Sequence, residues 1–170
     1  MDRMKIEYSG LDKLIEGTET IYTHTMSLGR GALGAAAGVV ADEVRKAIEA
    51  LPAEKEKENG RSRWATPDDP LTGVTNTERQ DLLNALGISS FKQSGSEITT
   101  SIGFDGYGSI PTKTFPQGVP NALLMRAIES GTTFRKKTPV IRRARVAGQK
   151  KANEAAQKKL NDLVKKMIGD

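Results

Sequence analysis

The chain contains no cysteine, and its 170 residues include a single histidine and a single tryptophan. The lack of cysteine excludes a disulfide framework, a thiol nucleophile and a cysteine-ligated metal. Aromatic residues make up only 5% of the chain, so the core must be built mainly from aliphatic side chains and alanine. No hydrophobic run is long enough to span a bilayer, and residues 1–8 lack the apolar stretch of a signal peptide. We therefore expect a soluble protein without a membrane partner.

Residues suited to catalysis or metal binding are few. His24 lies between two threonines near an expected helix start, where a capping or surface role is simpler than catalysis, and no second histidine can complete a triad. Residues 29–34 match G-x-G-x-x-G, but no hydrophobic strand precedes them, so a contact between helices explains these small residues better than a dinucleotide site. Asp68, Asp69 and Asp105 lack the spacing of a calcium loop. We expect neither enzymatic activity nor a bound cofactor or metal.

Charge is distributed unevenly along the chain. Residues 1–133 carry 14 Lys or Arg and 18 Asp or Glu, whereas residues 134–170 carry 12 and 3. The body is therefore mildly acidic and the C-terminal part strongly basic. Such asymmetry favours a polyanionic partner, an acidic protein surface, or contact between the tail of one copy and the body of another.

The hydrophobic periodicity predicts an α+β fold, in which a small antiparallel sheet is packed by two long helices within a single domain, residues 1–170. Apolar residues at helical spacing alternate with proline and glycine signals that end each helix. We expect helices over residues 26–51, 77–86, 120–130 and 139–168, with a first helical turn at 11–15. We expect strands over residues 5–8, 88–92 and 97–104, the last two joined by a turn at 93–96.

Residues 53–75 are polar and interrupted by proline and glycine, which predicts a long mobile loop. Its one large apolar residue is Trp64. A tryptophan in such a loop can bury itself against a partner protein, or it can fold back onto the core of its own chain. Both interpretations remain open at the level of the sequence.

Lysine and arginine recur along the predicted helix 139–168 and in the turn before it. A basic stripe of this kind can neutralise several phosphates, although any long exposed amphipathic helix looks similar. The chain has no stacking aromatic pair, zinc finger or clear helix-turn-helix. The candidate contacts to a polyanion are Arg135, Lys136, Lys137, Arg145, Lys150 and Lys151.

Several short motifs occur in an order that resembles one family, the neck or tail-completion ("tail-component") proteins of long-tailed bacteriophages and prophages. The opening residues 4–14 and the alanine-rich segment 44–52 resemble the family's first strand, Gly-Leu turn and long helix, and residues 102–105 resemble the strand before its variable loop. The most specific matches are residues 127–132, which resemble an E-x-G-T turn, and residues 139–144, which resemble a P-F-(L/I)-R-x-A helix entry. Val140 replaces the phenylalanine of that pattern.

The resemblance implies a virion structural protein that acts where the head meets the tail or at the tail end. Its partners would be further copies of itself in a homo-oligomeric ring, neighbouring neck and tail proteins, and DNA passing through the lumen. It would be located in the virion, and in the host cytoplasm during assembly. The positions that we expect to define the interface or the fold are Trp64, Glu129, Gly131, Thr132, Arg142 and Arg143. The alternative is a sequence-tolerant nucleic-acid-binding protein that uses its basic C-terminal helix.

Overall fold

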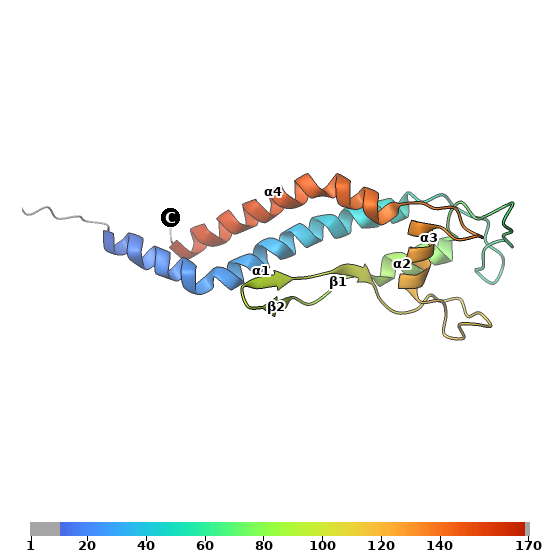
Figure 1. Ribbon diagram of the computed structural model, residues 1–170, viewed down its shortest axis with the longest axis horizontal. Helices are drawn as coiled ribbons and strands as arrows, with labels where there is room; N and C mark the ends of the chain where they lie inside the picture. Colours follow the sequence, from blue (N-terminus) through green and yellow to red (C-terminus); the bar gives the residue numbers. More distant parts are fainter. Residues whose placement is uncertain (1–10, 169–170) are drawn as a thin grey trace, which may run out of the picture.

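The computed structural model describes residues 11–168 and has an α+β fold, as predicted. Two long helices, α1 (Leu11–Glu49) and α4 (Val140–Ile168), pack along each other, and two short helices, α2 (Asn76–Ala85) and α3 (Asn121–Ser130), gather at one end (Figure 1). Within the described range, four short strands pair as two antiparallel two-stranded sheets. The strand predicted at residues 5–8 lies outside the described residues.

Helix α1 is much longer than the sequence predicted, because it begins at Leu11 rather than near Met26. The added part of the helix includes a threonine-rich stretch, residues 18–25. Three hydroxyl groups in it donate hydrogen bonds to backbone carbonyls four residues earlier, which satisfies them inside the helix; they belong to Thr20, Thr23 and Thr25. The expectation that His24 lies at a helix start is therefore wrong. Its exposed ring lies within α1, with Nδ1 2.9 Å from the carbonyl oxygen of Thr20.

The hydrophobic core lies where the C-terminal half of α1 meets the two short helices and the start of α4. Apolar side chains from all four helices contribute to it, so burial of this one cluster holds the elements together. Its buried members are Val44, Ile48, Leu51, Val74, Leu82, Leu86, Met125, Ile128, Val140 and Ala144. The remainder of the α1–α4 pair extends away from this core as two helices packed side by side (Figure 1).

Small residues on both helices allow α1 and α4 to pack closely. Ala144, Gly148 and Ala152 of α4 are buried at intervals of four residues, and a Cβ added at Gly148 would lie 3.2 Å from Glu43 of α1. Gly31 of α1 also lies at this contact, as the sequence predicts, because a Cβ there would lie 2.5 Å from Leu163 of α4. A Cβ at Gly34 would instead meet the Phe91 side chain at 3.4 Å, because that face of α1 is covered by the hairpin.

The predicted hairpin is present, with an interruption in the middle. Strands β2 (Lys92–Ser94) and β3 (Glu97–Thr99) flank a two-residue turn at Gly95, whose φ is 57°, and β1 (Leu86–Ile88) pairs with β4 (Ile102–Phe104). Between the two pairs, hydroxyl groups replace part of the backbone ladder. The Thr100 hydroxyl donates to the Ser89 carbonyl, and the Ser101 amide donates to the Ser89 hydroxyl. Each predicted strand is therefore split into shorter ones.

Helix α2 begins at Asn76, one residue earlier than predicted, because Thr75 is its N-cap. The Thr75 hydroxyl accepts a hydrogen bond from the Glu78 amide, and the Glu78 carboxylate accepts one from the Thr75 amide, which completes a capping box. The buried Thr75 hydroxyl also donates to the Gly60 carbonyl. This second bond ties the start of α2 to the loop that precedes it.

The junction between α3 and α4 is a compact unit built around Glu129 and Gly131. The Glu129 carboxylate, in the last turn of α3, accepts hydrogen bonds from the backbone amides of Ile141 at 2.8 Å and Arg142 at 3.2 Å. It thus caps the first turn of α4, where a negative charge is also favoured by the helix dipole. Gly131 ends α3 with φ of 77°, and a Cβ there would lie 3.0 Å from the backbone nitrogen of Lys137. Both the conformation and the space require glycine.

Replacing Glu129 with alanine should therefore destabilise the protein by about 1 kcal/mol, because two amide groups at the start of α4 lose their acceptor. Glu129→Gln should lose less, since the amide oxygen still accepts. The exposed Glu154, later in α4, provides the control Glu154→Ala, which we expect to change stability by less than about 0.5 kcal/mol. Chemical unfolding followed by circular dichroism measures all three. Equal losses for Glu129→Ala and Glu154→Ala would contradict the capping role.

Candidate protein-interaction site

The loop of residues 53–75 is tied back on itself by the carboxylate of Glu54. One carboxylate oxygen accepts hydrogen bonds from the Thr72 amide at 2.6 Å, the Gly73 amide at 3.1 Å and the Thr72 hydroxyl at 3.1 Å. Ala53 and Val74 form a backbone bridge beside these contacts. The two ends of the loop are therefore held together. That the loop is mobile remains a prediction.

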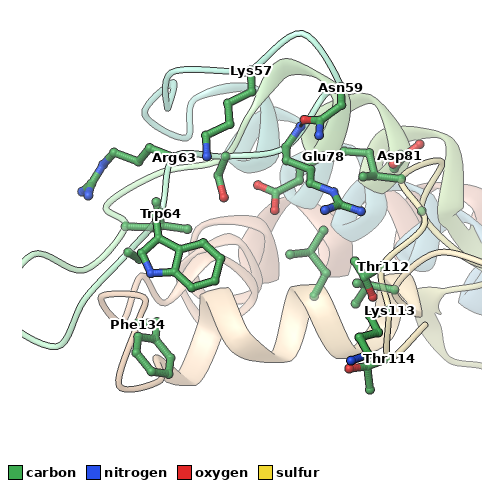
Figure 2. Close-up of a pocket in the computed structure, with 18 residues that line it drawn as sticks. Lys57, Asn59, Arg63, Trp64, Glu78, Asp81, Thr112, Lys113, Thr114 and Phe134 are labelled. Carbon is green, nitrogen blue, oxygen red and sulfur yellow. Dashed lines mark hydrogen bonds between the residues drawn. The ribbon is translucent and has the colours of Figure 1, made fainter. Parts of the chain in front are cut away.

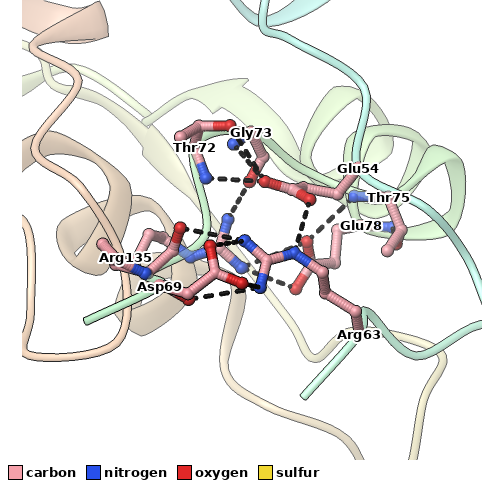
Figure 3. Close-up of polar contacts among 9 residues, drawn as sticks. Glu54, Arg63, Asp69, Thr72, Gly73, Thr75, Glu78 and Arg135 are labelled. Atoms are coloured by element: carbon pink, nitrogen blue, oxygen red, sulfur yellow. Dashed lines mark hydrogen bonds and ion pairs between the residues drawn. The ribbon is translucent and has the colours of Figure 1, made fainter. Parts of the chain in front are cut away.

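Arg63 fastens the middle of the same loop (Figure 3). Its guanidinium donates two hydrogen bonds to the Asp69 carboxylate, at 2.6 and 3.0 Å, and its Nε lies 3.5 Å from the second oxygen of Glu54. It also donates to the carbonyl of Pro70 at 3.1 Å. A planar guanidinium suits such a two-pronged contact, which fixes the direction of the chain on either side of Trp64.

Arg135 connects this loop to α2 and to the turn before α4. Its side chain donates to both carboxylate oxygens of Glu78, at 3.0 and 3.2 Å, and to the Gly73 carbonyl. Arg135 is only 8% exposed. Two backbone hydrogen bonds join the same segments, from the Leu71 amide to the Phe134 carbonyl and from the Lys136 amide to the Leu71 carbonyl. Removing one partner of a buried ion pair typically costs about 3–5 kcal/mol, so this contact is a structural one.

These contacts also alter the acidity of Glu54. Burial alone would raise its pKa, but the hydrogen bonds from the Thr72 and Gly73 amides and the Thr72 hydroxyl, together with the charge of Arg63, outweigh burial. The pKa of Glu54 is therefore held below its ordinary value of 4.5. The folded state thus favours the ionised carboxylate.

An open cleft of about 680 Å³ lies between this loop, the loop that follows β4, and α3. We call it the loop cleft. Trp64 and Phe134 stand on one side of it, and residues 112–114 on the other (Figure 2). Its apolar lining residues include Leu71, Ile110, Val119 and Leu124. A concave, largely apolar surface with aromatic side chains at its edge is typical of protein recognition sites.

Trp64 is 84% exposed and Phe134 is 53% exposed, although both border an apolar surface. Of the two interpretations left open by the sequence, a tryptophan folded back into its own core is therefore wrong. Large exposed aromatics are unusual unless something covers them, and tryptophan is the residue most enriched among the dominant contacts of interfaces. The role of Trp64 as an interface residue stays a prediction.

The edge of the loop cleft is mainly basic. Lys57 and Lys113 are exposed and form no ion pair with another described residue, and the guanidinium of Arg61 donates to the carbonyl of Pro111. Of the two lining acids, Glu78 is engaged by Arg135, and Asp81 accepts hydrogen bonds from the amide and hydroxyl of Ser109. A partner for this cleft should combine apolar and acidic groups.

The other expected interface residues do not line the loop cleft. Glu129, Gly131 and Thr132 form the α3–α4 junction, where the Thr132 amide donates to the Arg135 carbonyl and closes a tight turn. Their observed contacts are internal, so they shape the fold. Arg142 and Arg143 are exposed beside Glu129, in a separate shallow hollow of about 530 Å³.

The predicted polyanion contacts fall into two groups. Arg135 is buried against Glu78, so its assignment as a surface contact is wrong. Lys151 pairs with Glu43 at 3.0 Å, and the hydrogen bonds from Lys151 and Lys46 hold the pKa of Glu43 below its ordinary value. Lys150 lies 4.0 Å from Glu154. The remaining three are exposed and form no ion pair with another described residue: Lys136, Lys137 and Arg145.

Sequence reasoning missed Phe134, the aromatic partner of Trp64, and the acidic side chains that hold the loops. Phe134 follows the Gly-Thr-Thr turn, and an aromatic residue in such a turn could have been recognised as a surface candidate. The Thr75-x-x-Glu78 spacing was readable as a capping box. The pairing of Glu78 with Arg135, 57 residues away, has no local signal, because it depends on how the loops close.

Neither models of protein families, nor curated proteins, nor solved structures provide a match to this chain. Across residues 11–168, no three histidine, aspartate or glutamate side chains come together in a group that could hold a metal ion. In the same range no helix is long and apolar enough to cross a membrane. The candidate site must therefore be interpreted from its own geometry.

The acidity of Glu54 leads to a prediction about pH. A carboxylate whose pKa is lower in the folded state stabilises the protein above its unfolded pKa, and this contribution is lost as pH falls through the folded value. The gap in unfolding free energy between the wild type and Glu54→Gln should be constant above about pH 5.5 and shrink below about pH 4.5. Urea unfolding between about pH 3 and 7 measures it. The exposed Glu58, in the same loop, provides the control Glu58→Gln, and a gap for Glu54→Gln that does not vary with pH would contradict the assignment.

Proposed function

We propose that the protein is a structural component of a phage virion, located at the head–tail neck or at the tail end. Copies assemble into a ring and contact neighbouring neck and tail proteins, and the protein performs no catalysis. The observation that carries the proposal is the loop cleft, where Trp64 and Phe134 are exposed beside an apolar surface. The ion pairs next to it hold that surface in shape.

The geometry of the α3–α4 junction also supports the proposal, because this junction contains the residues that resemble the phage family. The residues that resemble the E-x-G-T turn and the proline-started helix entry form one unit, in which Glu129 caps α4 and Gly131 turns the chain. These matches are thus linked by contacts across the turn, which gives a physical reason for the motif to persist in a structural family. Arg142 and Arg143 next to it are exposed and free to meet a neighbour.

Deleting the coding sequence from the phage or prophage that carries it tests the proposal. Negative-stain electron microscopy of the lysate should show filled heads beside separate tails, because the joint cannot form. Expression of the wild-type chain in the same cells is the control and should restore joined particles. Joined particles in the deletion lysate without that supply would contradict the proposal.

A nucleic-acid-binding function is the second candidate, and the exposed basic residues near the start of α4 favour it. Lys136, Lys137 and Arg145 are exposed, and the carboxylate of Glu129 in the same region is occupied by the α4 amides. If DNA binding is the main function, the purified protein should bind duplex DNA with an affinity that falls steeply with salt, with a slope of several in a plot of log affinity against log salt. Fluorescence anisotropy at about 50 and 200 mM salt measures the slope. The structural proposal expects weak binding at the higher salt.

A further inference from the structure

Within α1, residues 16–27 form a segment that we call the arm. None of its described side chains is buried, and Leu28 is the first buried residue after it. Helix α4 ends beside Gly17, where a Cβ would meet Ile168 at 3.6 Å, so the first turns of α1 extend beyond it (Figure 1). Most helical stability in proteins comes from packing an apolar face, which makes an uncovered arm a candidate for contact with another molecule.

The arm presents an aromatic ring and negative charge. Tyr22 is 84% exposed, and the carboxyl-bearing residues Glu16 and Glu19 are exposed on the same arm.

The loop cleft offers the complementary surface at the opposite end of the molecule. It is apolar, bordered by Trp64 and Phe134, and edged by Lys57 and Lys113, neither of which forms an ion pair with another residue that the structure describes. The arm and the cleft lie at opposite ends of an elongated chain, so the arm of one copy cannot reach its own cleft (Figure 1). Opposite charges at the rim of an interface favour the encounter and fix the orientation of the partners.

We propose that the arm of one copy binds in the loop cleft of the next copy. The contact is heterologous, because it joins two different surfaces, and such contacts form rings when the rotation closes. The part of the arm that enters the cleft is its exposed side, which carries Glu16, Glu19 and Tyr22. This inference rests on the proposed self-assembly and identifies the two surfaces that make it.

Charge reversal on either surface tests the contact. The double variant Lys57→Glu with Lys113→Glu should no longer assemble, because the cleft and the arm then repel each other. The double variant Glu16→Lys with Glu19→Lys should fail to assemble for the same reason. Light scattering should give each of them the 18.4 kDa mass of one chain. Combining all four reversals in one chain, or mixing the two double variants, should restore assembly because the charges are complementary again. Lys55→Glu, an exposed reversal in the same loop outside the cleft, is the matched control and should assemble normally.

A second pair of variants separates the apolar contact from folding. Trp64→Ala should give single chains. At a concentration at which the wild type is also monomeric, the two should unfold at the same temperature, because the Trp64 side chain is exposed. Tyr107→Ala, an exposed aromatic that does not line the cleft, should assemble like the wild type.

A wild-type chain that remains monomeric, reversals that leave assembly intact, or a failure of the combined variant to recover would each overturn the inference. These masses are measured on the purified protein, independently of the particles in a deletion lysate. A monomeric wild type that is nonetheless required to join heads to tails, with Trp64→Ala unable to replace it, would assign the cleft to a different virion protein.

Discussion

The ion pair between Arg135 and Glu78 is the contact on which the other parts of the interaction surface depend. Arg135 comes from the turn before α4, Glu78 caps α2, and the Gly73 carbonyl that Arg135 also contacts belongs to the loop after α1. Three segments far apart in the sequence thus converge on one buried guanidinium, which can satisfy several acceptors at fixed angles. Because Phe134 precedes Arg135 and Leu71 lies beside it, the same contact sets the walls of the loop cleft.

The molecule has two ends with opposite character. At one end, the compact core and the tied loops present an apolar cleft with basic edges, and at the other, α1 extends as an arm in which residues 16–27 have no buried side chain. Surfaces that are already shaped bind with a lower entropic cost than surfaces that must order on contact. A cleft tied by ion pairs and an extended helix therefore suit the proposed head-to-tail contact between copies.

The sequence predicted the class of fold, the ends of α3 and α4, and the turn at Gly95, because proline, glycine and apolar spacing act locally. It failed where a local signal was ambiguous or absent. Threonines that bond within a helix look like a break in it, and the hydrogen bond from the capping Thr75 to the Gly60 carbonyl has no local signal in the sequence. In the loop cleft, Trp64 could be identified from the sequence because it is the one large apolar residue of a polar loop. The sequence indicated that Arg135 is an exposed cation. Its burial depends on Glu78, which is 57 residues away in the sequence and lies beside Arg135 only in the folded chain.

The absence of cysteine makes one experiment especially direct, since any thiol introduced will be the only one in the chain. A cysteine in place of the exposed Thr23 of the arm and one in place of the exposed Thr114 beside the cleft, carried on separate chains, can be joined by a short bifunctional maleimide. The account predicts abundant cross-linked dimers when the two variants are mixed, and few with either alone or with a cysteine at the exposed Asn153 of α4 in place of the arm cysteine. A mixture that yields no more dimer than each variant alone would contradict the claim that the arm of one copy occupies the cleft of the next.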